Sequence, residues 1–233
     1  MPTIVFMSPK GGAGKTTAAL ILATQLARGA PVTVIDADPN HPVKAWADSA
    51  KVSKNLTVVS DVNEENILER IEEEASRTPF VVVDLEGTAA KIVLLAVSQA
   101  DLVIVPTQGS QLDAEQASRA LKVIRQQEKM SRRTVNYSVL LTRTNPAIRT
   151  RTMAHIERGL MDAGVPIFTT ELHEREAFRA MFSFRQTLAD LSPSDVANLD
   201  KAIANAHAFA LEVIEQLRKQ NAMAATAQVK EPA

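Results

Sequence analysis

The stretch Lys10-Gly11-Gly12-Ala13-Gly14-Lys15-Thr16-Thr17 constrains the fold of this chain more than any other segment. It follows the apolar run Ile4-Val5-Phe6 and precedes a helical pattern that begins Ala18-Ala19-Leu20. A strand, a glycine-rich loop and a helix in this order form the context that a phosphate-binding loop requires. Glycine lets the backbone turn tightly and aim its N–H groups at phosphate oxygens, and the helix N-terminus adds partial positive charge. The stretch therefore predicts a nucleotide site.

Two side chains of this loop have separate predicted roles. Lys15 is expected to reach the β- and γ-phosphates, and the Thr16 hydroxyl is expected to bind Mg²⁺. The other expected contacts to the nucleotide come from Gly11, Gly12, Ala13, Gly14 and Thr17. A second lysine, Lys10, stands at the start of the loop.

Short apolar runs alternate with amphipathic segments along the chain. The predicted strands are Thr3–Met7, Val32–Ile35, Thr57–Val59, Phe80–Val83, Leu102–Val105 and Val135–Leu141. The predicted helices are Thr16–Arg28, Glu64–Ser76, Ala89–Ser98, Asp113–Lys129, Arg149–Ala163, Glu174–Phe182 and Pro193–Lys219, the last capped by Ser192. Nearly continuous apolar strands between helices predict an α/β fold with a doubly wound, mostly parallel sheet flanked by helices. We expect one domain over residues 1–219 and a disordered tail over 220–233.

The composition of the 233 residues excludes several kinds of chemistry. The chain has no cysteine, so disulfides, thiolate catalysis and cysteine-based zinc sites are excluded. Its formal net charge is −1, so a nucleic-acid surface would have to be a local basic patch. No signal peptide and no apolar segment of about 18 residues is present, and we expect a cytoplasmic protein.

Carboxylates follow two of the predicted strands. Asp36 and Asp38 come at the end of the second strand, where one could hold Mg²⁺ or its waters while the other orients the attacking water. Asp84 ends the apolar run Val81-Val82-Val83, and Gly87 follows three residues later. This is a Walker B-type edge, in which the carboxylate holds Mg²⁺ and the glycine amide senses the γ-phosphate. Ligands of doubly wound sheets bind beyond these carboxyl ends.

The ordered set of motifs resembles the ParA/MinD family of deviant-Walker ATPases, which position plasmids, chromosomes and other cargo inside bacteria. The set consists of the loop Lys10–Thr17, Asp36-Ala37-Asp38-Pro39, Asp84 with Gly87, and Thr142-Arg143-Thr144-Asn145-Pro146. The resemblance implies the P-loop NTPase fold, ATP with Mg²⁺, ATP hydrolysis and a homodimer that sandwiches the nucleotides.

The resemblance also implies roles for single residues. Lys10 matches the signature lysine that crosses the dimer interface to the phosphates of the partner, where a cation stabilises charge in trans. Asp38 matches the residue that orients the hydrolytic water, and Asp36 and Asp84 match the metal-side carboxylates. Asn145 matches the residue that contacts adenine.

Some segments point to a branch of this family. The short chain and the run His173-Glu174-Arg175-Glu176-Ala177-Phe178 resemble the small ATPases encoded with conjugative and T-DNA transfer systems. Two segments depart from the pattern of plasmid-type members. Glu86 adds a carboxylate after the Walker B aspartate, and Asn40-His41-Pro42 replaces the usual run after Pro39.

The resemblance to the ParA-like branch implies a nucleoid-associated dimer that binds DNA non-specifically. The candidate phosphate contacts are Arg149, Arg151, Arg175, Arg179, Arg185, Arg218 and Lys219. The last predicted helix carries Glu212 and Glu215 and has few bulky apolar anchors, so we expect no membrane anchoring. The expected protein partner is a cargo adaptor or a centromere-binding or relaxosome-type protein.

Two other functions stay open at this point. One is a nucleotide-gated adaptor that recruits a protein partner without binding DNA, a hypothesis motivated by Glu86 and by the Asn40-His41-Pro42 run. The other is an enzyme similar to dethiobiotin synthetase, which uses ATP to modify a small molecule. The second lysine of the loop counts against this last hypothesis.

Overall fold

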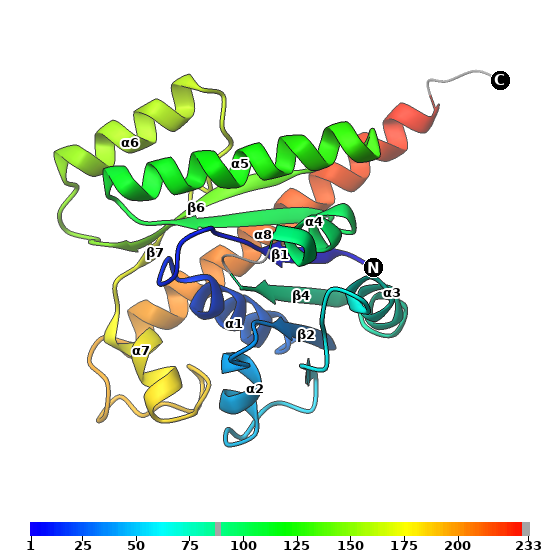
Figure 1. The fold of residues 1–233 in the computed structure, drawn as a ribbon. Helices are drawn as coiled ribbons and strands as arrows, with labels where there is room; N and C mark the ends of the chain where they lie inside the picture. Colours follow the sequence, from blue (N-terminus) through cyan, green and yellow to red (C-terminus); the bar gives the residue numbers. More distant parts are fainter. Residues whose placement is uncertain (87–89, 230–233) are drawn as a thin grey trace.

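A single parallel sheet forms the centre of the molecule (Figure 1). The computed structural model describes residues 1–86 and 90–229, without the side chains of residues 90, 111–114 and 224–229. The strands of the described part are β1 (Thr3–Phe6), β2 (Val32–Ala37), β3 (Leu56–Val59), β4 (Phe80–Leu85), β5 (Leu102–Thr107), β6 (Tyr137–Thr144) and β7 (Leu172–His173). They lie in the order β3-β2-β4-β1-β5-β6-β7, and every neighbouring pair is parallel.

Helices cover both faces of the sheet. They are α1 (Lys15–Leu26), α2 (Pro42–Ala47), α3 (Ile67–Arg77), α4 (Ala90–Ser98), α5 (Gln111–Ser131), α6 (Arg151–Asp162), α7 (Glu176–Ser183) and α8 (Leu199–Val229). One apolar core joins the sheet to α1, α2, α7 and α8, and a second joins it to α3, α4, α5 and α6. The fold is therefore the predicted doubly wound α/β sheet.

The side chains of β1 alternate between the two cores. Ile4 and Phe6 belong to the core on the α1 side, whereas Val5, and Met7 just past the end of the strand, belong to the core on the α5 side. Successive side chains of a strand point to opposite faces. Because both faces of this strand are covered, all four residues are apolar and buried.

The structure changes several predicted boundaries. All six predicted strands are present, and β2, β4 and β5 each continue two residues further than predicted. The short elements α2 and β7 were not predicted, since a helix of six residues and a strand of two leave little periodicity to detect. The expected tail 220–233 begins as helix, because α8 runs to Val229, and residues 230–233 lie outside the described part.

The predicted start of the last helix at Pro193 is wrong. The backbone N–H groups of Asp195 and Val196 both donate to the Ser192 carbonyl oxygen, which closes a turn. Asn198 then has a φ of +56°, a left-handed conformation that interrupts a right-handed helix. Ser192 therefore begins this turn, and α8 starts at Leu199.

Candidate functional site

The glycine-rich loop connects β1 to the N-terminus of α1. Gly12 has a φ of +78° and Gly14 a φ of +94°, conformations that a residue with a Cβ atom rarely adopts. The helix begins directly after Gly14, and the Ala18 N–H donates to the Gly14 carbonyl at 2.9 Å. The strand–loop–helix arrangement predicted for a phosphate site is thus present.

Two side chains from other strands hold the carbonyl groups of this loop. The Thr142 hydroxyl, on β6, donates to the Ala13 carbonyl oxygen at 2.9 Å. The Gln108 amide, just after β5, donates to the Gly12 carbonyl oxygen at 2.6 Å. Neither anchoring role was predicted, although Thr142 belongs to one of the motifs. The only sequence signal was the position of both residues at the ends of apolar strands.

The lysines of the loop occupy different environments. Lys15 is 8% exposed, and its ammonium group donates to the Lys10 carbonyl oxygen at 3.4 Å. Lys10 is half-buried at the start of the loop, where its N–H donates to the Ser8 hydroxyl at 3.4 Å. The charge of Lys15 therefore lies inside the loop, as expected for a lysine that contacts phosphate.

Two carboxylates lie side by side next to the loop. Asp36 on β2 and Asp84 on β4 are register partners in the sheet, and both are 0% exposed. Three of their four carboxylate oxygens have no hydrogen-bond partner among the described residues: Oδ1 of Asp36 and both oxygens of Asp84. Unpartnered buried oxygens are costly, so this pair requires an explanation in terms of function.

Burial raises the pKa of both carboxyl groups. The pKa of Asp84 rises to about 7, chiefly through burial and further through the negative charge of Asp36, while the Thr16 hydroxyl and the Lys15 charge oppose the rise. Burial also raises the pKa of Asp36, against the Lys44 N–H, which donates to Oδ2 at 2.9 Å. A positive charge placed beside these oxygens would favour their ionised forms.

The donor set fits a magnesium ion that is shared with phosphate. The hydroxyl of Thr16 and the oxygens of Asp36 and Asp84 are hard ligands of the kind that Mg²⁺ prefers. Within the described ranges, no three acidic or histidine side chains lie close enough to hold a metal by themselves. Mg²⁺ commonly completes its coordination with phosphate oxygens of the substrate and with water. The adjacent glycine-rich loop would hold such phosphates beside the ion.

Asp38 lies at the rim of the same site, beyond the end of β2. It is less buried than Asp36, and its Oδ1 accepts hydrogen bonds from the N–H and the side-chain amide of Asn40, at 2.9 and 3.0 Å. His41 follows with a φ of +46° and precedes α2. The Asn40-His41-Pro42 run therefore forms a tight turn into α2.

Asn145 does not line the cavity that reaches the loop. A cavity of about 450 Å³ touches Gly14 and Thr17, and Asn145 instead lines a neighbouring cavity of about 700 Å³. Its Oδ1 accepts the N–H groups of Ala147 and Ile148 at 2.8 and 3.1 Å, which closes a turn. Arg143, with a φ of +53°, lines both cavities. A contact between Asn145 and adenine stays a prediction.

The seven candidate DNA contacts do not form one patch. Arg149 pairs with Glu157 and Glu171, Arg179 pairs with Glu174 and Glu176, and Lys219 pairs with Glu215. Arg218 lies 19 residues after the start of α8, roughly 28 Å at the rise of an α-helix, whereas α7 lies beside that start (Figure 1). The other members, Arg151, Arg175 and Arg185, lie at the start of α6 and around α7.

Some predicted features cannot be placed. Gly87, the expected γ-phosphate sensor, lies outside the described residues, while Glu86 is half-buried directly after β4.

In the described part of the chain, no helix is long and apolar enough to span a membrane.

Comparison with known proteins places these features in a family. The family model described as VirC1 protein matches residues 1–222. The protein ParA of Rhizobium radiobacter is 40% identical over 218 residues, covering 93% of this chain and 98% of its own length. The protein virC1 of Rhizobium rhizogenes is 30% identical over 189 residues, covering 78% of this chain and 80% of its own length.

A solved structure agrees with the fold. The complex of a Cyanothece McdA variant with ATP superposes with a TM-score of 0.68 at 19% identity, covering 88% of this chain and 96% of the other. At this identity the likeness concerns the arrangement of strands and helices alone.

Proposed function

The chain belongs to the VirC1 family and, with it, to the ParA-type partitioning and positioning ATPases, and on that premise we propose that it acts as an Mg-ATP-dependent switch between monomer and dimer. The observation that carries this proposal is the buried pair Asp36 and Asp84, with three unpartnered oxygens beside the glycine-rich loop. Such a pair is costly without a compensating positive charge and suits a bound cation.

In this proposal, different residues bind the phosphates, hold the metal ion and orient the water. The backbone of the loop and Lys15 bind the phosphates, while Thr16, Asp36 and Asp84 hold Mg²⁺ directly or through water. Asp38, at the rim, orients the water for attack on the γ-phosphate. Bound Mg-ATP supplies the phosphoryl group whose loss resets the switch. The cavity of about 450 Å³ beside Gly14 and Thr17 offers room for the remainder of the nucleotide.

Lys10 makes dimerisation depend on ATP in this proposal. The residue stands at the start of the loop, away from the buried position of Lys15. We propose that its ammonium group reaches the phosphates of the partner protomer, where it stabilises the negative charge that two facing triphosphates bring together. Without nucleotide, this attraction is absent and the protomers separate.

The dimer is proposed to bind DNA without sequence preference in the cytoplasm and to remain associated with the nucleoid. The relatives named ParA and virC1 support a cargo connected with plasmids or DNA transfer. A cargo adaptor or a centromere-binding or relaxosome-type protein would stimulate hydrolysis and release the dimer from DNA.

Three variants test the nucleotide switch. Lys15→Ala should abolish ATP binding, since it removes the cation that lies inside the loop. Lys10→Ala should retain ATP binding by the monomer and lose ATP-driven dimerisation in light scattering. Lys54→Ala, at an exposed lysine in the segment before β3, is the matched control and should dimerise normally. Normal ATP-driven dimerisation of Lys10→Ala would refute the role of this lysine in trans.

A further inference from the structure

Charge is distributed unevenly in this chain. Residues 111–164 contain ten lysines and arginines against five aspartates and glutamates, a formal net charge of +5 in a chain whose total is −1. This segment comprises α5, β6 and α6. A near-neutral protein with such a segment has a locally strong positive field.

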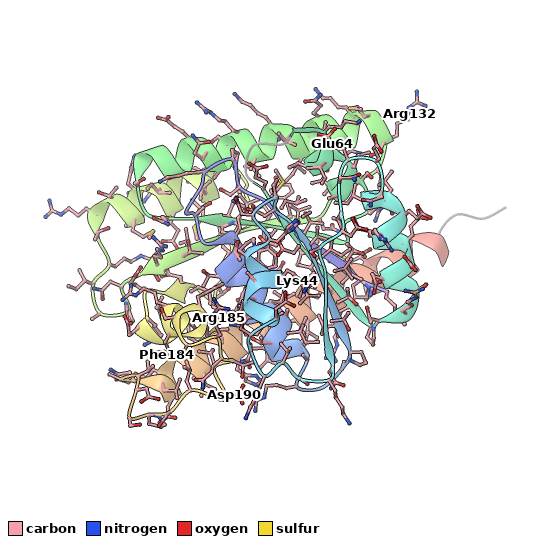
Figure 2. All side chains as sticks on the ribbon, turned by 60° about the horizontal axis from the view of Figure 1, so that its bottom comes forward. Lys44, Glu64, Arg132, Phe184, Arg185 and Asp190 are labelled. Carbon is pink, nitrogen blue, oxygen red and sulfur yellow. The ribbon has the colours of Figure 1, made fainter. Side chains whose placement is uncertain are left out.

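The cations of α5 lie along one face of the helix. At about 100° per residue, Arg119, Lys122, Arg125 and Lys129 fall on a single arc. All four are exposed, while Ala117, Ala120, Leu121 and Ile124 on the opposite arc are buried against the sheet. Figure 2 shows nitrogen-tipped side chains projecting outward along α5, with Arg132 just past its end.

The neighbouring helix α6 repeats this arrangement. Arg151, His155 and Arg158 are exposed at spacings of four and three residues, opposite the buried residues Met153 and Ile156. The two helices lie side by side on the same face of the sheet (Figure 1). A depression of about 320 Å³ runs between them, and its walls include Lys122, Arg125 and His155.

The positive charge of this surface is not neutralised by neighbouring side chains. Among the described residues, no carboxylate forms an ion pair with the six cations Arg119, Lys122, Arg125, Lys129, Arg151 and Arg158. Two acidic residues of these helices are engaged elsewhere, since Glu128 accepts the Val135 N–H and Glu157 pairs with Arg149, while the exposed Glu115, one turn before Arg119, forms no ion pair with it. This surface therefore differs from Arg149, Arg179 and Lys219, each of which has an acidic partner.

We propose that these six cations and His155, which together form the α5–α6 basic face, bind the phosphate backbone of duplex DNA. This proposal rests on the proposed function, and it moves the centre of DNA binding from α7 and α8 to α5 and α6. From Arg119 to Lys129 the row of cations extends for roughly 15 Å, with one cation every 4.5 to 6 Å or so. A row of this kind can follow the phosphates along one strand of a duplex.

The composition of the face selects duplex DNA among polyanions. Single-stranded nucleic acid is bound largely by stacking its bases on aromatic side chains. Neither α5 nor α6 contains phenylalanine, tyrosine or tryptophan. Membrane surfaces require bulky apolar anchors beside the cations, and among the described side chains of these helices the large apolar residues that are exposed, Met130 and Met161, lie at the C-terminal ends.

A charge-matched pair of triple variants tests the proposal. The first is Lys122→Gln with Arg125→Gln and Arg158→Gln, which removes three cations from the α5–α6 basic face. The control removes three exposed cations elsewhere, by Arg28→Gln, Lys51→Gln and Lys54→Gln, near the end of α1 and before β3. Both variants lose the same net charge, and neither set includes a residue of the nucleotide site.

Binding to a fluorescent duplex of arbitrary sequence is measured with ATP between about 50 and 200 mM salt. Each lost phosphate contact lowers the magnitude of the slope of log K against log salt by about one. The slope measured for the first variant should therefore be smaller in magnitude by about three for each protomer. Its affinity near 0.1 M salt should fall on the order of a hundredfold. The control should bind as the unmodified protein does, and ATP hydrolysis without DNA should be unchanged in both variants.

The experiment distinguishes a failure of the proposed DNA binding from a failure of the surface assignment alone. If the unmodified protein dimerises with ATP but binds no duplex at low salt, DNA binding is refuted and the surface assignment with it. If the unmodified protein binds the duplex and the first variant binds equally well, only the α5–α6 basic face is refuted. Equal weakening of both triple variants would also refute it, because the effect would then follow net charge rather than position.

Discussion

The buried carboxyl group of Asp84 makes the stability of the nucleotide-free protein depend on pH. In the folded chain its pKa rises from 3.8 to about 7, chiefly because burial disfavours the charged form. The folded state therefore holds this proton more tightly than the unfolded state does. Between pH of about 4 and about 7 the unfolded chain releases the proton first, so the free energy of unfolding falls as the pH rises.

The magnitude follows from the two pKa values. Each pKa unit corresponds to about 1.4 kcal/mol, so the ionised Asp84 costs about 4 kcal/mol of stability above pH of about 7 and nothing below pH of about 4. Asp84→Asn removes the titration. The stability of this variant relative to the unmodified protein should improve by about 2.5 kcal/mol between pH of about 5 and about 8. Any cost of burying the uncharged amide in these surroundings does not change with pH and cancels from the comparison.

Urea unfolding measures this effect directly. The buried residue Trp46, the sole tryptophan of the chain, reports unfolding by fluorescence. The experiment is performed with EDTA and without nucleotide. Asp61→Asn is the control, because the side chain of Asp61 is 91% exposed. A difference between Asp84→Asn and the unmodified protein that stays constant from pH of about 5 to about 8 would refute the reasoning.

Three further predictions concern the loop, the rim and α2. Asp38→Ala should lower phosphate release by two orders of magnitude or so while retaining the ATP-bound dimer in size-exclusion chromatography, and hydrolysis at the normal rate would contradict its role. Gly14→Ala should lower the free energy of unfolding by about 1 to 2 kcal/mol, because its φ of +94° strains any residue with a Cβ atom, and an unchanged urea midpoint would contradict this. Trp46→Phe should cost about 0.5 to 1.5 kcal/mol, since it removes the 2.9 Å hydrogen bond from the indole to the Met181 carbonyl oxygen, which still accepts the Gln186 N–H at 3.0 Å, and circular dichroism on urea titration measures the loss.

The parts of the fold that were predicted depend on local sequence. A glycine-rich loop between an apolar run and a helical pattern leaves one arrangement available, and the structure has it. The positions of Asp36 and Asp84 at strand ends were also local signals. Their pairing was not, because β2 and β4 are separated in sequence by β3 and α3, and only the strand order of the sheet makes them register partners.

The parts that were missed depend on contacts between distant segments. The ion pair of Arg149 with Glu171 was not predicted, because the two residues lie on segments far apart in the sequence. Ser192 and Pro193 carry the chemistry of a helix start, yet the chain uses them for a turn. The start of α2 had a detectable signal, since Pro42 stands at its first position, where proline is favoured.

Helix α2 connects Asp36 to α7. A helix of six residues is not stable alone, so its contacts fix its position. Asp36 Oδ2 accepts the Lys44 N–H in its first turn, and the Trp46 indole N–H donates to the Met181 carbonyl oxygen of α7. Helix α7 in turn lines the cavity that touches Gly14 and Thr17. If Asp36 turned toward a bound cation, the hydrogen bond that holds the start of α2 would weaken, and the strain would pass to α7 through Trp46. The Trp46→Phe variant removes the hydrogen bond that joins α2 to α7. ATP binding should therefore protect α7 from hydrogen exchange less in this variant than in the unmodified protein. Equal protection in both proteins would refute the connection between Asp36 and α7.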